Sequence, residues 1–276
     1  MRTLLAAALA LAAALPLAAS AEPKPRWELG AGATGLRLPD YRGSDESRSY
    51  VFPLPFFAYR GKVMRFDREG LRGVLLESER VELDLSLAGS LPVDSDKNRA
   101  RQGMPDLDPV LEIGPKLNLT LWRDRPKDRR LDLRFAVRGV IATDLRHTQD
   151  AGYVLHPHLN YDFRPDLGGK WDASAQLGPL YGSRRNHQYY YGVDPQFATL
   201  ERPAYAADGG YSGLAAGGSL RRRFGKLWVG AFARYDALQG AVFESSPLVK
   251  RSRSFAAGVA VAWVFAESKE LVDIDD

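Results

Sequence analysis

The chain has 276 residues, a net charge of +4 and no cysteine. Without cysteine, neither a disulfide framework nor a thiolate metal site is available. The positive excess is small, and the arginines are scattered rather than gathered in dense basic blocks, so the composition gives no sign of nucleic-acid binding.

The N-terminus is predicted to be a signal peptide that covers residues 1–21. Arg2 provides a short positive start, residues 4–17 form an apolar run, and a small-residue cleavage triplet ends at Ala21. Cleavage before Glu22 would release the mature chain. The alternative, an N-terminal membrane anchor, is disfavoured because the apolar run is short for a spanning helix and ends in the cleavage triplet.

After the signal peptide, apolar and polar residues alternate in segments of about ten residues. In chain order, the predicted strands are residues 27–38, 50–59, 63–68, 71–77, 81–91, 109–121, 131–143, 153–163, 171–181, 211–222, 227–238 and 254–265. The clearest is 81–91, in which leucines share one face while Glu82 and Asp84 lie on the other. One face for lipid and one for a polar lumen predicts a single antiparallel transmembrane β-barrel.

The predicted count is twelve strands, or ten if the weak 63–77 hairpin does not span the membrane. Both numbers are even, as bacterial single-chain barrels require. Pro53 and Pro55 predict that strand 50–59 is irregular or bent, because two prolines weaken a hydrogen-bonded ladder. The alternative fold, a soluble β-sandwich, would show strands of about five or six residues and fewer aromatic residues at the strand ends.

The connections are predicted to differ in length between the two ends of the barrel. Long segments fall on one side, at residues 40–49, 92–108, 144–152, 182–210 and 239–253, and short turns fall on the other. Outer-membrane barrels have long extracellular loops and short periplasmic turns. The barrel is therefore expected to cover residues 22–265, with both termini in the periplasm. Residues 266–276 are expected to be a flexible acidic periplasmic tail.

A polar network is predicted inside the lumen, formed by residues whose side chains share the inner face of neighbouring strands. Its candidate members are Arg134, Arg138, His156, His158, Asp162 and Asp172. Two histidines make only half of a tetrahedral metal site, and no nucleophile accompanies them. The sequence therefore assigns no catalytic, cofactor-binding or metal-binding residues, and mixed lumen charges favour a filled lumen over an ion-selective ring.

The longest loop, residues 182–210, is a candidate extracellular contact surface. It contains Arg184, Arg185, Tyr189, Tyr190 and Tyr191. Tyrosine and arginine are common anchors of binding surfaces, and arginine suits the phosphates of lipopolysaccharide. An ordered lid folded over the barrel mouth is the equally weighted alternative.

Several short sequence words resemble the MltA-interacting protein (MipA/OmpV) family of Gram-negative outer membranes. Their order and spacing cover nearly the whole mature chain. The words are residues 38–44 (L-P-D-Y-R-G-S), 52–55 (F-P-L-P), 66–67 with 70–73 (F-D, G-L-R-G), 157–161 (P-H-L-N-Y), 191–194 (Y-G-V-D), 240–241 (G-A) and 246–249 (S-P-L-V).

This resemblance implies an outer-membrane barrel without catalytic residues or cofactors. It also implies a non-enzymatic scaffold role for peptidoglycan-remodelling enzymes, a lytic murein transglycosylase and a penicillin-binding protein. Other members of the family are described as porin-like or as adhesins, so a channel for small solutes and an adhesin remain alternatives. The remaining expected partners are outer-membrane lipid and lipopolysaccharide. The chain departs from barrels that end on an aromatic residue, because Phe265 is followed by eleven further residues.

Overall fold

The computed structural model describes residues 24–60, 64–67, 70–144 and 146–272. The predicted signal peptide and its cleavage site at Ala21 and Glu22 lie outside the described residues. Within them, no helix is long and apolar enough to cross a membrane.

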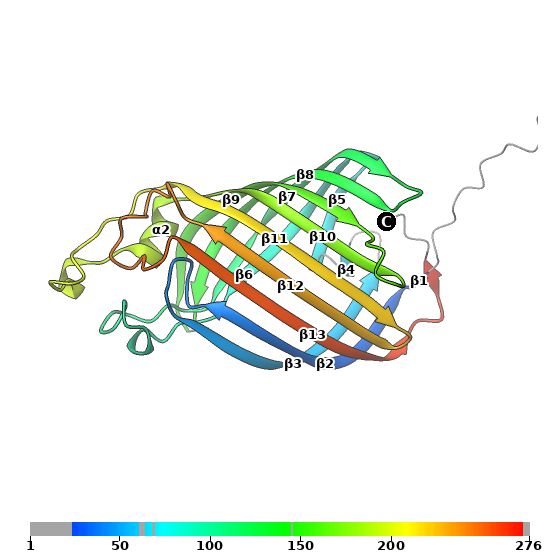
Figure 1. Cartoon of the computed structure of the whole chain (residues 1–276), viewed down its shortest axis with the longest axis horizontal. Helices are drawn as coiled ribbons and strands as arrows, with labels where there is room; N and C mark the ends of the chain where they lie inside the picture. The colour runs from blue at the N-terminus through cyan, green and yellow to red at the C-terminus, as the bar shows by residue number, and fades with distance from the viewer. Residues whose placement is uncertain (1–23, 61–63, 68–69, 145, 273–276) are drawn as a thin grey trace, which may run out of the picture.

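Twelve of the strands in the described residues form a closed antiparallel barrel (Figure 1). Neighbours in sequence pair with each other around the ring, and β13 returns to pair with β2, as predicted. The strands of the barrel are β2 (Trp27–Pro39), β3 (Ser47–Arg60), β4 (Met64–Asp67), β5 (Gly70–Glu77), β6 (Val81–Ser90), β7 (Val110–Asp124), β8 (Arg129–Thr143), β9 (Thr148–Phe163), β10 (Trp171–Gly182), β11 (Gly210–Phe224), β12 (Leu227–Ala237) and β13 (Arg253–Glu267).

The predicted two faces of the strands are confirmed by the exposure of their side chains. On β8, Arg134 is 7% exposed and its neighbour Phe135 is 36% exposed. On β9, His158 is 7% exposed and Leu159 is 44% exposed. The register pairs Arg134 with His158, and paired residues project from the same face of a sheet. On β8 and β9, polar side chains therefore line the lumen while apolar ones face outward.

The ring is weakest between β3 and β6, where the predicted 63–77 hairpin forms two short strands. β4 pairs with β3 only at Tyr59 and Arg60, and β5 pairs with β6 only from Glu82 to Leu85. We call the remaining facing edges, residues 47–55 of β3 and 86–90 of β6, the seam. Along these stretches, no described strand pairs with β3 on the side away from β2, or with β6 on the side away from β7. The hairpin thus closes the barrel without spanning its full height.

Of the two effects predicted for Pro53 and Pro55, an irregular strand or a bend, the irregular strand was wrong. β3 is continuous over Ser47–Arg60 and keeps an unshifted register with β2 along its whole length. Both prolines are tolerated because β3 is an edge strand along the seam, which is where a sheet accommodates residues without an N–H.

Four loops pack together at one end of the barrel and form a cap over its mouth (Figure 1). We define the cap as residues 40–46, 92–108, 183–209 and 238–252. It includes helix α2 (Arg184–Tyr191) and two short 3₁₀ helices, η1 (Ser95–Lys97) and η2 (Pro195–Phe197). Its buried apolar side chains are Tyr41, Val93, Ala100, Leu107, Tyr191, Val193, Ala207, Leu238, Ala241, Phe243 and Leu248.

The two chain ends meet at the opposite end of the barrel, which carries the short turns (Figure 1). Strand β1 (Lys24–Pro25) pairs with β14 (Leu271–Val272). Arg26 supports this small sheet by donating two hydrogen bonds to the Glu270 carboxylate, at 2.9 and 3.0 Å. The expectation of a flexible tail was wrong for residues 266–272: the first two belong to β13, and the chain then folds back to pair with the N-terminal segment.

Candidate functional site

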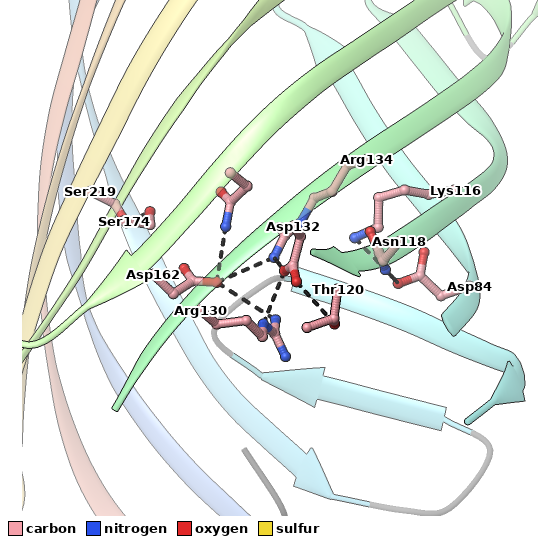
Figure 2. A network of polar contacts seen from close by, with 11 residues as sticks. Asp84, Lys116, Asn118, Thr120, Arg130, Asp132, Arg134, Asp162, Ser174 and Ser219 are labelled. Atoms are coloured by element: carbon pink, nitrogen blue, oxygen red, sulfur yellow. Dashed lines mark hydrogen bonds and ion pairs between the residues drawn. The ribbon is translucent and has the colours of Figure 1, made fainter. Parts of the chain in front are cut away.

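One wall of the lumen is built from charged side chains on β6 to β10. At its centre Asp132, 1% exposed, is contacted by three neighbours (Figure 2). Arg134 Nη2 lies 3.0 Å from Asp132 Oδ2, Arg130 Nε lies 2.9 Å from the same oxygen, and Thr120 Oγ1 donates to Oδ1 at 3.1 Å. Arg134 also reaches Asp162 at 3.3 Å, which joins β8 to β9.

A second group on this wall surrounds Asp84, whose side chain is fully buried on β6. Lys116 Nζ lies 3.2 Å from Asp84 Oδ2, and Asn118 Nδ2 donates to the same oxygen at 3.1 Å (Figure 2). Both partners come from β7, because the register places Lys116 opposite Asp84. A buried carboxylate requires such partners, since an unpaired charge away from water is very costly.

The six residues predicted as one network are divided among four groups. Arg134 and Asp162 share the cluster around Asp132, whereas Arg138 pairs with Glu112 at 2.8 Å. The rings of His156 and His158 stack with their centroids 4.2 Å apart, and His158 Nδ1 lies 3.0 Å from the His156 carbonyl oxygen.

Asp172 lies apart from the other predicted members, close to the turns. It accepts from Arg164 at 3.0 Å and lies 3.8 Å from Arg221. Asp84, Lys116 and Asp132 also belong to the lumen clusters, although they were not among the six predicted members of the network. Their inward positions follow from the alternation, but their pairing follows only from the register between strands.

A further ion cluster connects the cap to the lumen at the loop end. Asp236, 4% exposed on β12, accepts from Arg42 at 3.0 Å and from Arg234 at 2.8 and 2.9 Å. Arg42 belongs to the cap and also donates to the Ser212 carbonyl oxygen at 2.6 Å. The cap is thus held to the barrel wall by charge as well as by its apolar core.

Another carboxylate, Glu28, is buried inside the turn end of the barrel. It is 1% exposed and accepts from Arg60 at 2.7 Å and from Arg223 on β11. Arg223 also reaches Glu267 at 3.3 Å, at the end of β13. This cluster links strands on both sides of β13 where the chain termini meet.

The predicted contact loop contains helix α2, which the sequence analysis did not predict. Ser183 caps the helix N-terminus because its side chain accepts a hydrogen bond from the Asn186 N–H, and a serine before the helix was the signal available in the sequence. Tyr191 is 3% exposed and stacks on Phe243, whereas Tyr189 and Tyr190 pack partly buried against the cap core. The tyrosines therefore face inward.

The arginines of the same helix lie on the outer surface. Arg184 and Arg185 are exposed, and Arg185 forms an ion pair with Asp150 at the start of β9. Both line a cleft of about 790 Å³ between the cap loops. Of the predicted contact residues, the two arginines on this basic edge therefore remain available for contact.

Burial shifts the titration of several groups in the cap. Burial lowers the pKa of His187, whose Nδ1 lies 2.6 Å from the Asp208 carbonyl oxygen and whose Nε2 lies 2.6 Å from Ser212 Oγ. Burial also raises the pKa of Tyr190 to about 12. These side chains are therefore neutral at physiological pH, as a packed interior requires. Among the described residues, no group of three or more His, Asp or Glu side chains could hold a metal ion.

Comparison with known proteins agrees with this architecture. The family described as MltA-interacting protein MipA matches residues 30–265. The chain belongs to this family. Outer membrane protein Omp26La of Vibrio anguillarum and outer membrane protein OmpV of Vibrio cholerae are each 26% identical to it over 228 residues, which is 80% of this chain and 80% of each relative. This member of the MipA family is an outer-membrane protein.

Solved structures show a weaker likeness. A bacterial polysaccharide outer membrane secretin is 9% identical with a TM-score of 0.43, and covers 87% of this chain and 99% of its own. The NanC porin is 6% identical with a TM-score of 0.39, and covers 85% and 98%.

Proposed function

We propose that this MipA-family protein is a non-enzymatic scaffold that holds a lytic murein transglycosylase, together with a penicillin-binding protein, at the outer membrane. The family description names MltA as an interacting protein, and the residues match that family over most of their length. In this role the barrel is the membrane anchor and its turn end is the surface that meets the periplasmic enzymes.

The observation that carries the proposal is the packed cap. Phe243, Leu238 and Leu248 have no exposed surface, and together with Tyr191 they form an apolar core over the barrel mouth. An apolar core excludes water, so a channel through this end would have to unpack it. The cap therefore favours a closed anchor over an open diffusion pore.

The turn end offers a defined surface for a partner. The β1–β14 sheet projects there, and its neighbours Arg26 and Glu270 are 43% and 59% exposed. Exposed charges around a small ordered sheet can steer and position a charged partner. Outer-membrane barrels direct their short turns to the periplasm, where peptidoglycan is remodelled.

Binding and conductance measured on the same preparation test the proposal. The mature protein in lipid nanodiscs is expected to bind a purified lytic murein transglycosylase in a surface-binding assay, while empty nanodiscs do not. In planar bilayers it is expected to show no steady large openings. Steady openings together with absence of enzyme binding would reverse the assignment and favour the porin-like alternative.

A further inference from the structure

The lumen has two chemically different walls, and only one of them is polar. The register carries the inner face from Asp162 through Ser174 and Ser219 to Phe232, then through Gly258 to Leu36 and Tyr50. Figure 2 shows Asp162, Ser174 and Ser219 inside the barrel. Around Phe232 the inner face therefore changes from polar to apolar as the chain passes from β11 to β12, whereas Arg234 and Asp236 keep the loop end of β12 charged.

The apolar lumen wall is formed by large side chains on β2, β3 and β12. Its members are Leu36, Phe52, Leu54, Phe56, Trp228 and Phe232. The rings of Phe56 and Trp228 lie 5.8 Å apart although two strands separate β3 from β12, so both project into the same interior. A side chain on Gly258 would collide with Phe232 and Leu36, and one on Gly230 would collide with the Trp228 ring. The rings thus lie over glycines along the wall.

This wall is accessible, unlike the charged wall that faces it. Phe232 is 40% exposed and Phe52 is 38% exposed, although both point inward. On the charged wall, Asp84 and Asp132 are 0% and 1% exposed. Large apolar surface left open inside a protein favours a ligand that covers it.

The seam lies beside the apolar wall and exposes backbone groups of β3. The Arg60 N–H donates to the Arg26 carbonyl oxygen at 2.8 Å, and the register from there to Ser47 is unshifted. Even-numbered residues of β3 therefore bond to β2, and odd-numbered residues direct their N–H and C=O groups to the other edge. At residues 49, 51, 53 and 55 that edge has four carbonyl groups but only two N–H groups, because Pro53 and Pro55 have none.

Both ends of the seam are fixed by other parts of the chain. At the loop end, Arg48 donates to the Lys97 carbonyl oxygen at 3.1 Å, and Arg99 pairs with Asp45 at 2.9 Å. At the turn end, β4 and β5 complete the ring. Between these limits no ladder of hydrogen bonds joins β3 to β6 among the described strands, so separating the two strands there breaks the fewest backbone hydrogen bonds.

We propose that the lumen binds a single-chain amphiphile with a hydroxyl-bearing head group, taken from the outer leaflet through the seam. The acyl chain lies along the apolar lumen wall. The head group donates hydrogen bonds to the carbonyl-rich edge of β3, which is costly to leave unsatisfied at membrane depth. The seam lies in the outer half of the membrane because the loops are extracellular.

Photo-crosslinking of the mature protein in phosphatidylcholine nanodiscs tests this inference. The probe is a monoacylglycerol with a diazirine in its chain. Adducts are expected on the inward residues Phe52 and Phe232, and excess unlabelled monoacylglycerol should abolish them. Adducts on the outward residue Val259 should persist, because that residue meets bulk lipid. The corresponding acyl methyl ester, which has no donor, should label only outward residues.

Two variant pairs separate binding in the lumen from passage through the seam. Phe232→Gln is expected to lower inward labelling about tenfold, since much of one ring's apolar contact is lost; Phe255→Gln, on the lipid face, should leave it unchanged. The chain has no cysteine, so a single introduced cysteine can be modified selectively. Val51→Cys, beside the seam, is modified with a bulky maleimide, and Val259→Cys modified in the same way is the control. Only the former should block inward labelling. Inward adducts that are missing, that resist competition or that form equally with the methyl ester would overturn the inference.

Discussion

Tyr191 and Phe243 stack face to face over the barrel mouth, with ring centroids 3.7 Å apart and planes 7° from parallel. Tyr191 ends helix α2, and Phe243 lies in a loop between β12 and β13. His187 packs edge-on against Phe243 at 4.7 Å, so the stack joins three side chains from two cap segments. Both rings belong to the buried apolar core of the cap.

Phe243→Ala is expected to loosen the cap while the barrel remains assembled. Truncation of a fully buried phenylalanine costs about 3–5 kcal/mol, here taken mainly from cap packing. Protease cleavage within residues 238–252 should become much faster, whereas the mobility shift between unheated and boiled gel samples should persist. Val242→Ala is the matched control, because Val242 is 38% exposed and should change little. Equal protection of both variants would contradict a packed cap.

Asp84→Asn should destabilise the barrel strongly, because it removes the buried carboxylate that lies 3.2 Å from Lys116 Nζ. Loss of one partner of a buried pair costs about 3–5 kcal/mol. Asp172→Asn is the comparison: Asp172 is 22% exposed at the side chain, and more exposed pairs contribute about 1 kcal/mol or less. Urea unfolding in lipid vesicles measures both. The double variant Asp84→Asn/Lys116→Met should recover part of the loss; no recovery would argue against pairing as the cause.

Adjacent residues of β10 test the assignment of faces. Leu177 is 51% exposed on the lipid face, and Gln176 shares the lumen face with Gly217 of β11. Leu177→Arg should cost about 2–4 kcal/mol near the middle of the membrane, whereas Gln176→Arg should assemble nearly as the parent does. The fraction of heat-modifiable protein in purified membranes reports assembly. If both variants assembled equally well, the faces would be wrongly assigned.

Acidic pH should loosen the cap through His187. Burial lowers the pKa of this imidazole, the nearby Arg42 guanidinium acts in the same direction, and the Asp208 carbonyl oxygen opposes them. Because the folded pKa lies below the ordinary value of about 6.5, the unfolded cap binds more protons. Stability is therefore complete above pH 6.5 and decreases below it, by up to about 1.4 kcal/mol per pH unit, until the folded pKa is reached.

Hydrogen exchange of the cap amides at pH 7.5 and 5.5, corrected for the intrinsic rate, measures this effect. Protection should decrease at the lower pH in the parent protein. His147→Asn should show the same decrease, since His147 is 88% exposed at the side chain and lies outside the cap. His187→Gln should remove most of the pH dependence; a response that persists in this variant would place its origin elsewhere.

Local periodicity predicted most of the barrel, because strand faces depend on residues two apart. It placed Asp132, Arg134 and His158 inside without knowledge of any partner. The division of the lumen charges into separate groups could not be predicted, since the contact of Asp84 with Lys116 depends on register between strands. The cap depends on still longer separations: Tyr41 donates to the Leu248 carbonyl oxygen across 207 residues. No pattern within either loop signals that contact.

The C-terminal segment provides the last test, because two truncations should separate its roles. Ending the chain after Glu267 removes β14 and the Arg26–Glu270 pair but keeps the β13–β2 pairing from Ala257 opposite Arg37 to Glu267 opposite Glu28. The barrel should assemble normally, and binding of the transglycosylase should decrease severalfold if the β1–β14 sheet is its docking surface.

Ending the chain after Phe265 restores an aromatic terminus but also removes Glu267, a partner of Arg223. This shorter chain should assemble less completely on gels. Unchanged enzyme binding after the first truncation would show that the sheet does not contact the partner, and failure of that variant to assemble would show that residues 268–276 belong to the fold.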